Sequence, residues 1–124
     1  MKQISVENQT TPLQSGLAAG YCDSFLCRFK GLMFRSSIPE NWGLLLVQPS
    51  ESIVNAAIHM FGVPFNLGVI WINDDGIVVD LAEAKKWVGV KSPKKPARFI
   101  LEVTPSRLEE FNIGDNIAFL EHGT

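Results

Sequence analysis

The segment that most constrains the fold is the run Leu67–Ile72, which is followed by Asp74-Asp75-Gly76 and then by Ile77–Leu81. The run is apolar and shows no alternation, which is typical of a strand buried on both faces. An Asp-Gly pair after such a run favours a tight hairpin turn. These residues therefore predict a β-hairpin whose first strand, with Trp71, lies in the core.

Further short strands are predicted on both sides of this hairpin. Lys2–Asn8 alternates apolar and polar residues, and Leu17–Cys22 could pair with it across a polar loop. Ala97–Val103 also alternates, so Arg98, Ile100 and Glu102 are expected to share one side. The remaining predicted strands are the buried segment Trp42–Pro49, the segment Ile53–Phe61 and a last strand that begins near Asp115. Ala56-Ala57 makes a short helical turn an alternative within Ile53–Phe61.

Two short helices are predicted, over residues 24–34 and 105–113. In the first, Phe25, Phe29, Leu32 and Met33 fall at helical spacing and predict a buried face against the strand that follows. On that reading, Phe29→Ala would cost about 3–5 kcal/mol. In the second, Ser106 and Glu109 suggest a capping box, and Gly114 is placed to end the helix.

The order of these elements predicts a mainly β (α+β) fold. Seven or eight short strands, with helices inserted rather than alternating, favour a compact antiparallel or mixed sheet that is barrel- or sandwich-like. They disfavour a doubly wound α/β fold, whose repeated crossovers need longer units. The length of 124 residues is expected to form one domain, residues 1–124.

Charge and hydropathy argue against several classes of partner. The net charge is −2, which provides no global electrostatic case for binding nucleic acid or an anionic membrane. The longest apolar runs fall far short of the roughly 20 residues of a membrane-spanning helix. The amino-terminal residues lack the apolar region of a secretory signal, so a cytoplasmic location is expected.

The two cysteines, Cys22 and Cys27, are five positions apart. On a helix this spacing turns the side chains through about 500°, so they would point well apart. A cytoplasmic location disfavours a disulfide further. Two partly buried free thiols are therefore expected, and neither the cysteine spacing nor the histidine surroundings select a metal site or a cofactor.

Four blocks in order resemble the domain of unknown function 192 family, an uncharacterised prokaryotic family of single-domain proteins. They are "DSFLCRFKGLMFR", "GLLLVQP", "IHMFGVPFNLGVIWINDDGIVVD" and "PARFILEVTPSRLEEFNIGDNIAF". The resemblance covers roughly Ile4 to Phe119, and it implies a compact, mainly β domain without an established activity. Many members carry an acid before the central buried strand, where this chain has Gly68.

His59 is the first candidate for a functional residue. In an extended segment it would share a face with Ala57 and Phe61, and no acid at short spacing pairs with it. A half-buried imidazole can satisfy both nitrogens on backbone groups, so a structural role competes with ligand binding. Asn55, Asn66 and Trp87 are the residues expected to join His59 around a small cleft.

A basic cluster is the second candidate. Six cations, Lys85, Lys86, Lys91, Lys94, Lys95 and Arg98, surround Trp87 and could hold a phosphate or a single strand. The plainer interpretation is a solvated loop, and no nucleic-acid binding is expected from it.

A binding or accessory protein is the function that these residues favour. The partner would be a small polar molecule or a peptide, bound by a monomer or weak dimer, with no cofactor. The alternative is a hydrolase-like enzyme in which His59 acts as base with a carboxylate or thiol that the fold supplies. A stability or assembly factor without any ligand is a third alternative.

Overall fold

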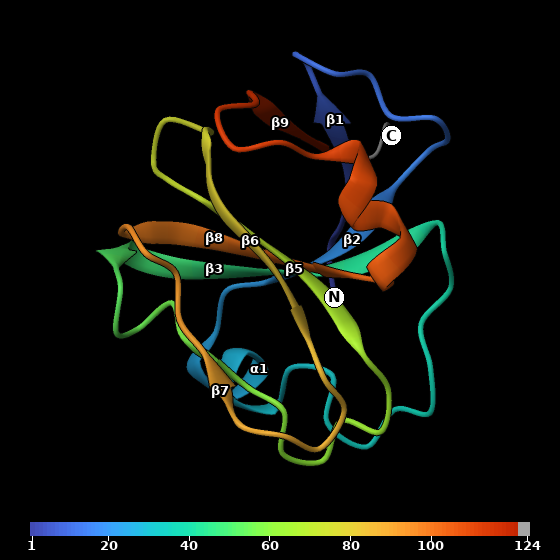
Figure 1. Ribbon diagram of the computed structural model, residues 1–124, viewed down its shortest axis with the longest axis vertical. Helices are drawn as coiled ribbons and strands as arrows, with labels where there is room; N and C mark the ends of the chain where they lie inside the picture. The colour runs from blue at the N-terminus through green and yellow to red at the C-terminus, as the bar shows by residue number, and fades with distance from the viewer. Residues whose placement is uncertain (122–124) are drawn as a thin grey trace.

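The computed structural model describes residues 1–121 and has a sheet at its centre (Figure 1). Seven strands form a mixed sheet in the order β6-β5-β8-β3-β2-β1-β9. The only parallel pair in this described sheet is β2 with β3. The bounds are β1 Gln3–Asn8, β2 Ala18–Cys22, β3 Trp42–Ser52, β5 Leu67–Ile72, β6 Val78–Ala84, β8 Ala97–Val103 and β9 Ile117–Glu121.

The mainly β prediction is confirmed, although the sheet does not close into a barrel. An isolated bridge between Ile77 and Asn116 brings the chain before β6 close to the chain before β9. A separate two-stranded sheet pairs β4 (Ile58–His59) with β7 (Val90–Lys91). Only two residues of the predicted strand Ile53–Phe61 are therefore in a strand, because turns occupy the residues on both sides. No helix among residues 1–121 is long and apolar enough to cross a membrane.

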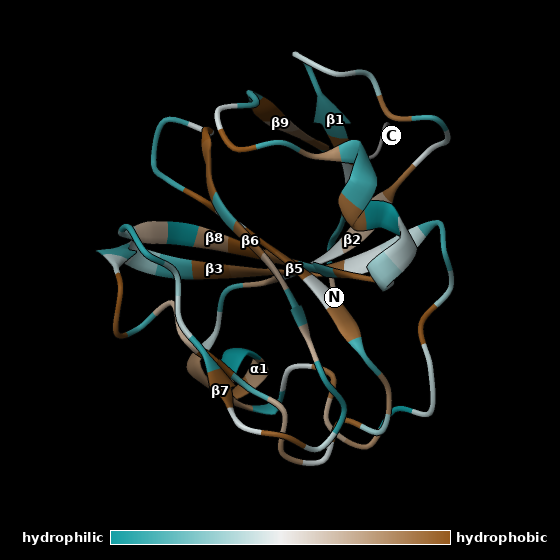
Figure 2. Ribbon diagram, viewed as in Figure 1, coloured by the Kyte–Doolittle hydropathy of each residue, from teal (hydrophilic) through white to brown (hydrophobic). Residues whose placement is uncertain are grey.

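The hairpin predicted from Leu67 to Leu81 is confirmed. Residues of β5 alternate between two apolar clusters, one on each face of the sheet, and Trp71 is fully buried. Asn73 shapes the turn, because its Oδ1 accepts hydrogen bonds from the backbone N–H groups of Asp75 and Ile77. Figure 2 shows hydrophobic residues along much of the central strands β3, β5 and β8.

Gly68 in β5 lies where the second helix crosses the sheet. A Cβ at this position would come within 2.8 Å of Leu108 Cγ and 3.2 Å of the Thr104 carbonyl oxygen. The helix is a 3-10 helix, η1 (Pro105–Glu110), shorter than the predicted 105–113. A side chain at this position would require Leu108 or the chain at Thr104 to shift, so Gly68 permits the close approach of η1.

The predicted capping box of η1 is wrong. Thr104 is the N-cap residue, and its side chain makes no capping hydrogen bond. Ser106 Oγ instead donates to a carboxylate oxygen of Glu40 at 2.7 Å. Because η1 is a single short 3-10 segment that ends before Phe111, Gly114 belongs to the following turn.

The predicted apolar face of the first helix is also wrong. The helix α1 covers only Phe25–Lys30 and contains no buried residue. Phe25 is 76% exposed and Phe29 is 59% exposed, whereas Leu32 and Met33 are buried but lie beyond the helix. The helix ends at Gly31, so the later apolar residues do not continue its face. The predicted cost for Phe29→Ala therefore falls to about 1 kcal/mol or less.

The prediction of two free thiols is wrong, because Cys22 and Cys27 form a disulfide. The angular argument assumed one helix, but Cys22 ends β2 and Cys27 lies in α1. The chain reverses between them, with Ser24 as N-cap, and the two Cα atoms are 5.6 Å apart. The crosslink thus ties α1 to the sheet.

Replacing both cysteines with alanine should lower the free energy of unfolding by about 2 kcal/mol. The crosslink closes a short loop in the unfolded chain and so reduces its conformational entropy, and the variant lacks this restriction. Denaturant titration of the parent and the double variant, each with and without reductant, measures this. Reductant should shift the parent toward the variant and leave the variant unchanged. Free thiols that react with an alkylating reagent in the native, unreduced parent would contradict the crosslink.

Candidate functional site

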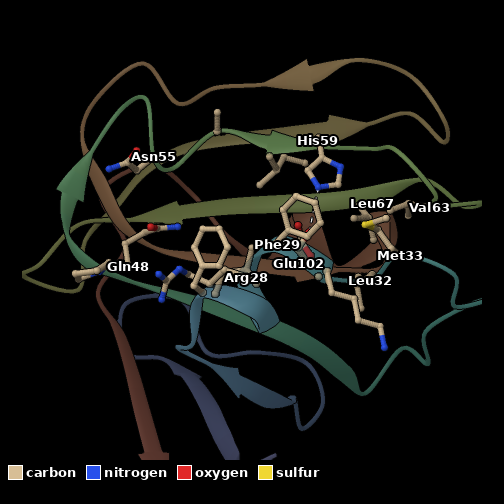
Figure 3. Close-up of a pocket in the computed structure, with 17 residues that line it drawn as sticks. Arg28, Phe29, Leu32, Met33, Gln48, Asn55, His59, Val63, Leu67 and Glu102 are labelled. Carbon is tan, nitrogen blue, oxygen red and sulfur yellow. Dashed lines mark hydrogen bonds between the residues drawn. The ribbon is translucent and has the colours of Figure 1, made fainter.

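A pocket of about 400 Å³ lies between α1, the sheet and the segment around β4. This volume is within the usual range for small-molecule sites. Figure 3 shows the side chains around it. The described residues that line it are Phe25, Arg28, Phe29, Lys30, Gly31, Leu32, Met33, Leu46, Gln48, Pro49, Asn55, Ala57, Ile58, His59, Val63, Leu67 and Glu102.

Apolar side chains from two strands and from two loops form the inside of the pocket. Leu46 comes from β3, Leu67 begins β5, and both belong to the core cluster on this face of the sheet. Leu32 follows α1, and Val63 follows β4. All four are at most 5% exposed, so a ligand that reaches them would leave water.

Glu102 is the carboxyl group of the pocket. It lies on the central strand β8, opposite Leu44 of β3 and Val69 of β5, and is 4% exposed. Burial among these apolar neighbours disfavours the charged form and raises the pKa of Glu102 to about 8. At neutral pH the group is therefore mainly a neutral carboxylic acid, which can donate one hydrogen bond into the pocket.

His59 lies on the rim of the pocket, beside Phe29. The two ring centroids are 6.3 Å apart, and His59 Nε2 lies 3.3 Å from the Phe29 carbonyl oxygen. The rings of Phe25 and Phe29 stack with their centroids 6.4 Å apart. The rings of Phe25, Phe29 and His59 therefore form a row along the rim of the pocket. One imidazole nitrogen is thus close to the backbone, and the other can face a ligand.

Arg28 is held over the pocket by backbone groups. Its Nη1 donates to the carbonyl oxygens of Asp23 and Val47, the latter at 3.1 Å. Gln48, next along β3, is 9% exposed and also lines the pocket. A guanidinium and an amide at one end of an apolar pocket can recognise a carboxylate or a carbonyl oxygen.

The structure brings together two of the four candidate residues from the sequence. His59 and Asn55 line the pocket, whereas Asn66 and Trp87 do not. Asn66 Oδ1 accepts a hydrogen bond from the Lys86 backbone N–H at 2.8 Å, and the Trp87 N–H donates to the Val63 carbonyl oxygen. Asn66 therefore supports the loop that carries Trp87, beside the pocket.

Sequence reasoning missed Glu102, Arg28 and Gln48. One signal was available for Glu102, because an acid between Leu101 and Val103 in an alternating strand is unusual on a buried face. The alternation itself was predicted correctly, since Ile100 belongs to the cluster on the pocket face and Leu101 to the other. Nothing local to Arg28 or Gln48 distinguishes them from surface residues.

Comparison with known proteins identifies the fold and a family. Residues 6–119 match the family described as "Uncharacterized ACR", DUF192. A UPF0127 protein of Thermococcus kodakarensis is 41% identical over 99 residues, covering 78% of this chain and 61% of that protein. A UPF0127 protein of Pyrococcus furiosus is 32% identical over 112 residues, which cover 89% of this chain and 93% of that protein. This chain thus spans about three fifths of the Thermococcus kodakarensis relative.

Two crystal structures share the fold. A protein of Sinorhizobium meliloti 1021, named as a candidate transcription regulator, superposes with a TM-score of 0.82 at 16% identity, covering 95% of this chain and 92% of that one. A protein of unknown function from Novosphingobium aromaticivorans gives 0.73 at 18% identity, covering 94% and 83%. At these identities the likeness extends to the fold alone.

Proposed function

This chain belongs to the DUF192 family of uncharacterised proteins, and from its pocket we propose that it binds a small amphipathic molecule. The observation that carries the proposal is an apolar pocket of about 400 Å³ with a buried carboxyl group, Glu102, among its lining residues. The apolar body of the ligand would displace water from Leu46, Leu67 and their neighbours.

The chemistry of the polar groups suggests which end group the ligand carries. Protonated Glu102 offers a hydrogen-bond donor, and Arg28 offers a cation whose position is set by two backbone carbonyls. Gln48, Asn55 and His59 can each donate as well. Because these side chains are all hydrogen-bond donors, they suit a ligand whose end group accepts hydrogen bonds. The proposed end group is therefore a carboxylate or an amide rather than an amine.

Three probes with one apolar body test this proposal: phenylbutyrate, phenylbutyramide and phenylbutylamine. The acid and the amide should raise the melting temperature below pH about 7, where Glu102 is protonated, and the amine should not. Affinity for the amide, measured by calorimetry, should fall as the pH rises above about 8, because ionised Glu102 no longer donates.

Two variants separate the role of Glu102 from general packing. Glu102→Gln keeps a donor and should bind the amide without the fall above pH about 8. Glu102→Leu removes the donor and should weaken binding about tenfold. Arg28→Ala should weaken binding of the acid more than binding of the amide. Lys2→Ala, which removes an exposed cation elsewhere, is the matched control. If neither the acid nor the amide raises the melting temperature of the parent, the proposal is wrong.

A second function, an enzyme that uses the same pocket, is favoured by one observation. The fold supplies a carboxyl group, Glu102, to the pocket that His59 lines, and its pKa of about 8 suits proton transfer near neutral pH. Hydrolysis of ester homologues of the bound probe tests it. Turnover that survives in both Glu102→Gln and His59→Gln would exclude this mechanism.

We propose a cytoplasmic location for this activity. The Cys22–Cys27 disulfide opposes this proposal, because cytoplasmic thiols are mostly kept reduced and only Cys22 of the pair is buried.

A further inference from the structure

Exposed apolar side chains gather on one side of the sheet, around the mouth of the pocket. The apolar pole, as we call it, consists of residues 25–35, 53–63 and 85–91, which include α1, β4 and β7 in the lower half of Figure 1. It contains most of the large hydrophobic side chains that the described structure leaves exposed: Phe25, Leu26, Phe29, Phe34, Ile53, Val54, Phe61, Trp87, Val88 and Val90. Figure 2 shows hydrophobic residues on β7 within it.

Direct contacts make the three segments one surface. The Phe34 N–H donates to the Gly62 carbonyl oxygen at 2.7 Å, and β4 pairs with β7. The backbone N–H of Trp87 also donates to the Val63 carbonyl oxygen at 3.1 Å, which joins the second and third segments. An apolar surface of this extent is rare on a protein that has no partner.

The charges of the apolar pole all have the same sign. Its three segments contain Arg28, Lys30, Arg35, Lys85, Lys86 and Lys91 and no aspartate or glutamate. Glu83, next to the third segment, pairs with Lys85 at 3.2 Å, and the other five cations leave the pole positive although the chain has a net charge of −2. A surface that combines exposed aromatic rings with cations complements an anionic, partly apolar partner.

Backbone conformation supports a binding role for two of the aromatic residues. Among residues 1–121, the non-glycine residues with positive φ are Phe34, at 67°, and Trp87, at 66°. This left-handed conformation is costly for bulky side chains and tends to persist where a function requires it. The backbone N–H of each residue is hydrogen-bonded, but the side chains are 76% and 60% exposed, so burial of the rings does not account for this conformation.

We propose that the apolar pole docks onto the surface of an anionic lipid bilayer. Aromatic side chains insert at the level of the headgroups, and flanking lysines and arginines gain from the negative surface potential. A second copy of the chain fits less well, since two such faces would bring like charges together. The mouth of the pocket lies within the apolar pole. Docking on the bilayer does not require a ligand in the pocket.

Vesicle sedimentation tests the proposal with the intact protein. Vesicles of phosphatidylcholine with about 30 mol % phosphatidylglycerol should bind the protein at moderate salt, and pure phosphatidylcholine should bind it weakly. Binding should weaken as salt rises, because the headgroup attraction is screened. Failure to bind the anionic vesicles at low salt would overturn the proposal.

The variant Phe34→Gly/Trp87→Gly should lose about a hundredfold in vesicle affinity. Glycine accepts positive φ, so the melting temperature should hold or rise, which separates lost docking from lost folding. Ile113→Ser is the matched control, since Ile113 is 65% exposed on the loop between η1 and β9. Equal vesicle binding by the double variant and the parent would contradict the assignment.

Three further measurements exclude other partners. A single-stranded oligonucleotide and an acidic polyglutamate peptide should not compete with vesicles at moderate salt, because they offer charge without an apolar layer. Tight binding of either one that the double variant abolishes would reassign the surface. Sedimentation equilibrium should show no dimer that depends on Trp87, and such a dimer would also overturn the proposal.

Discussion

The stability of the protein is expected to fall as the pH rises from about 4.5 to about 8, and Glu102→Gln is expected to abolish most of this fall. The folded state holds the Glu102 proton with a pKa of about 8, whereas the unfolded chain releases it near the ordinary 4.5. Between these values the folded state binds more protons, so the free energy of unfolding decreases with increasing pH. Full stability from this group is present below pH about 4.5 and is lost above about 8.

The expected magnitude is large for one side chain. One pKa unit corresponds to about 1.4 kcal/mol, so the shift predicts a loss of about 5 kcal/mol. Urea titrations of parent and Glu102→Gln at a series of pH values measure it, and their difference isolates Glu102 from the other titrating groups. The two proteins should be similarly stable near pH 4.5, and the variant should be the more stable near pH 9. If the free energies of unfolding of parent and variant changed in parallel with pH, Glu102 would be charged in the folded protein as it is in the unfolded chain.

Trp71→Ala should lower the free energy of unfolding by about 3–5 kcal/mol. Trp71 is fully buried in β5, and its Nε1 donates to the Ala56 carbonyl oxygen at 2.8 Å. The variant would leave a cavity in the core and an unpaired carbonyl group. Because most single domains are stable by only 5–15 kcal/mol, this loss would populate unfolded protein at moderate temperature.

Trp71→Phe provides the matched control for this experiment. It retains much of the apolar volume and removes the hydrogen bond, so it should cost less than Trp71→Ala. Ala56 adjoins Asn55 and Ala57, which line the pocket, so both variants should also weaken probe binding at temperatures where they are folded. An alanine variant that unfolds at the same urea concentration as the parent would show that Trp71 contributes little to the core.

Local patterns predicted the elements whose form depends on neighbours in the sequence. The turn residues Asp74-Asp75-Gly76 and the continuous hydrophobicity of Leu67–Ile72 were sufficient to predict the β5–β6 hairpin. The prediction failed for α1, where helical spacing from Phe25 to Met33 matched a buried face that does not exist. Periodicity cannot distinguish apolar residues that face a core from those that face a pocket or an external partner.

The candidate site was only partly accessible to sequence reasoning. His59 and Asn55 were chosen because polar residues in an apolar segment are conspicuous, and both line the pocket. Asn66 was chosen as a hydrogen-bond donor and Trp87 as an aromatic residue next to a loop, but Asn66 holds the loop of Trp87 beside the pocket instead. Whether any of the four binds a ligand remains a prediction that the three probes test.

The amino-acid sequence by itself determined the mainly β class, the central hairpin and the burial of Trp71, because each follows from hydrophobic pattern and turn residues over a few positions. The tertiary structure alone decided the disulfide, the exposure of Phe25 and Phe29, and the pocket. It also decided the state of Glu102, whose pKa rises because β3 and β5 flank it with Leu44 and Val69. Desolvation depends on which distant segments surround a group, and the positions adjacent to that group along the chain do not contain this information.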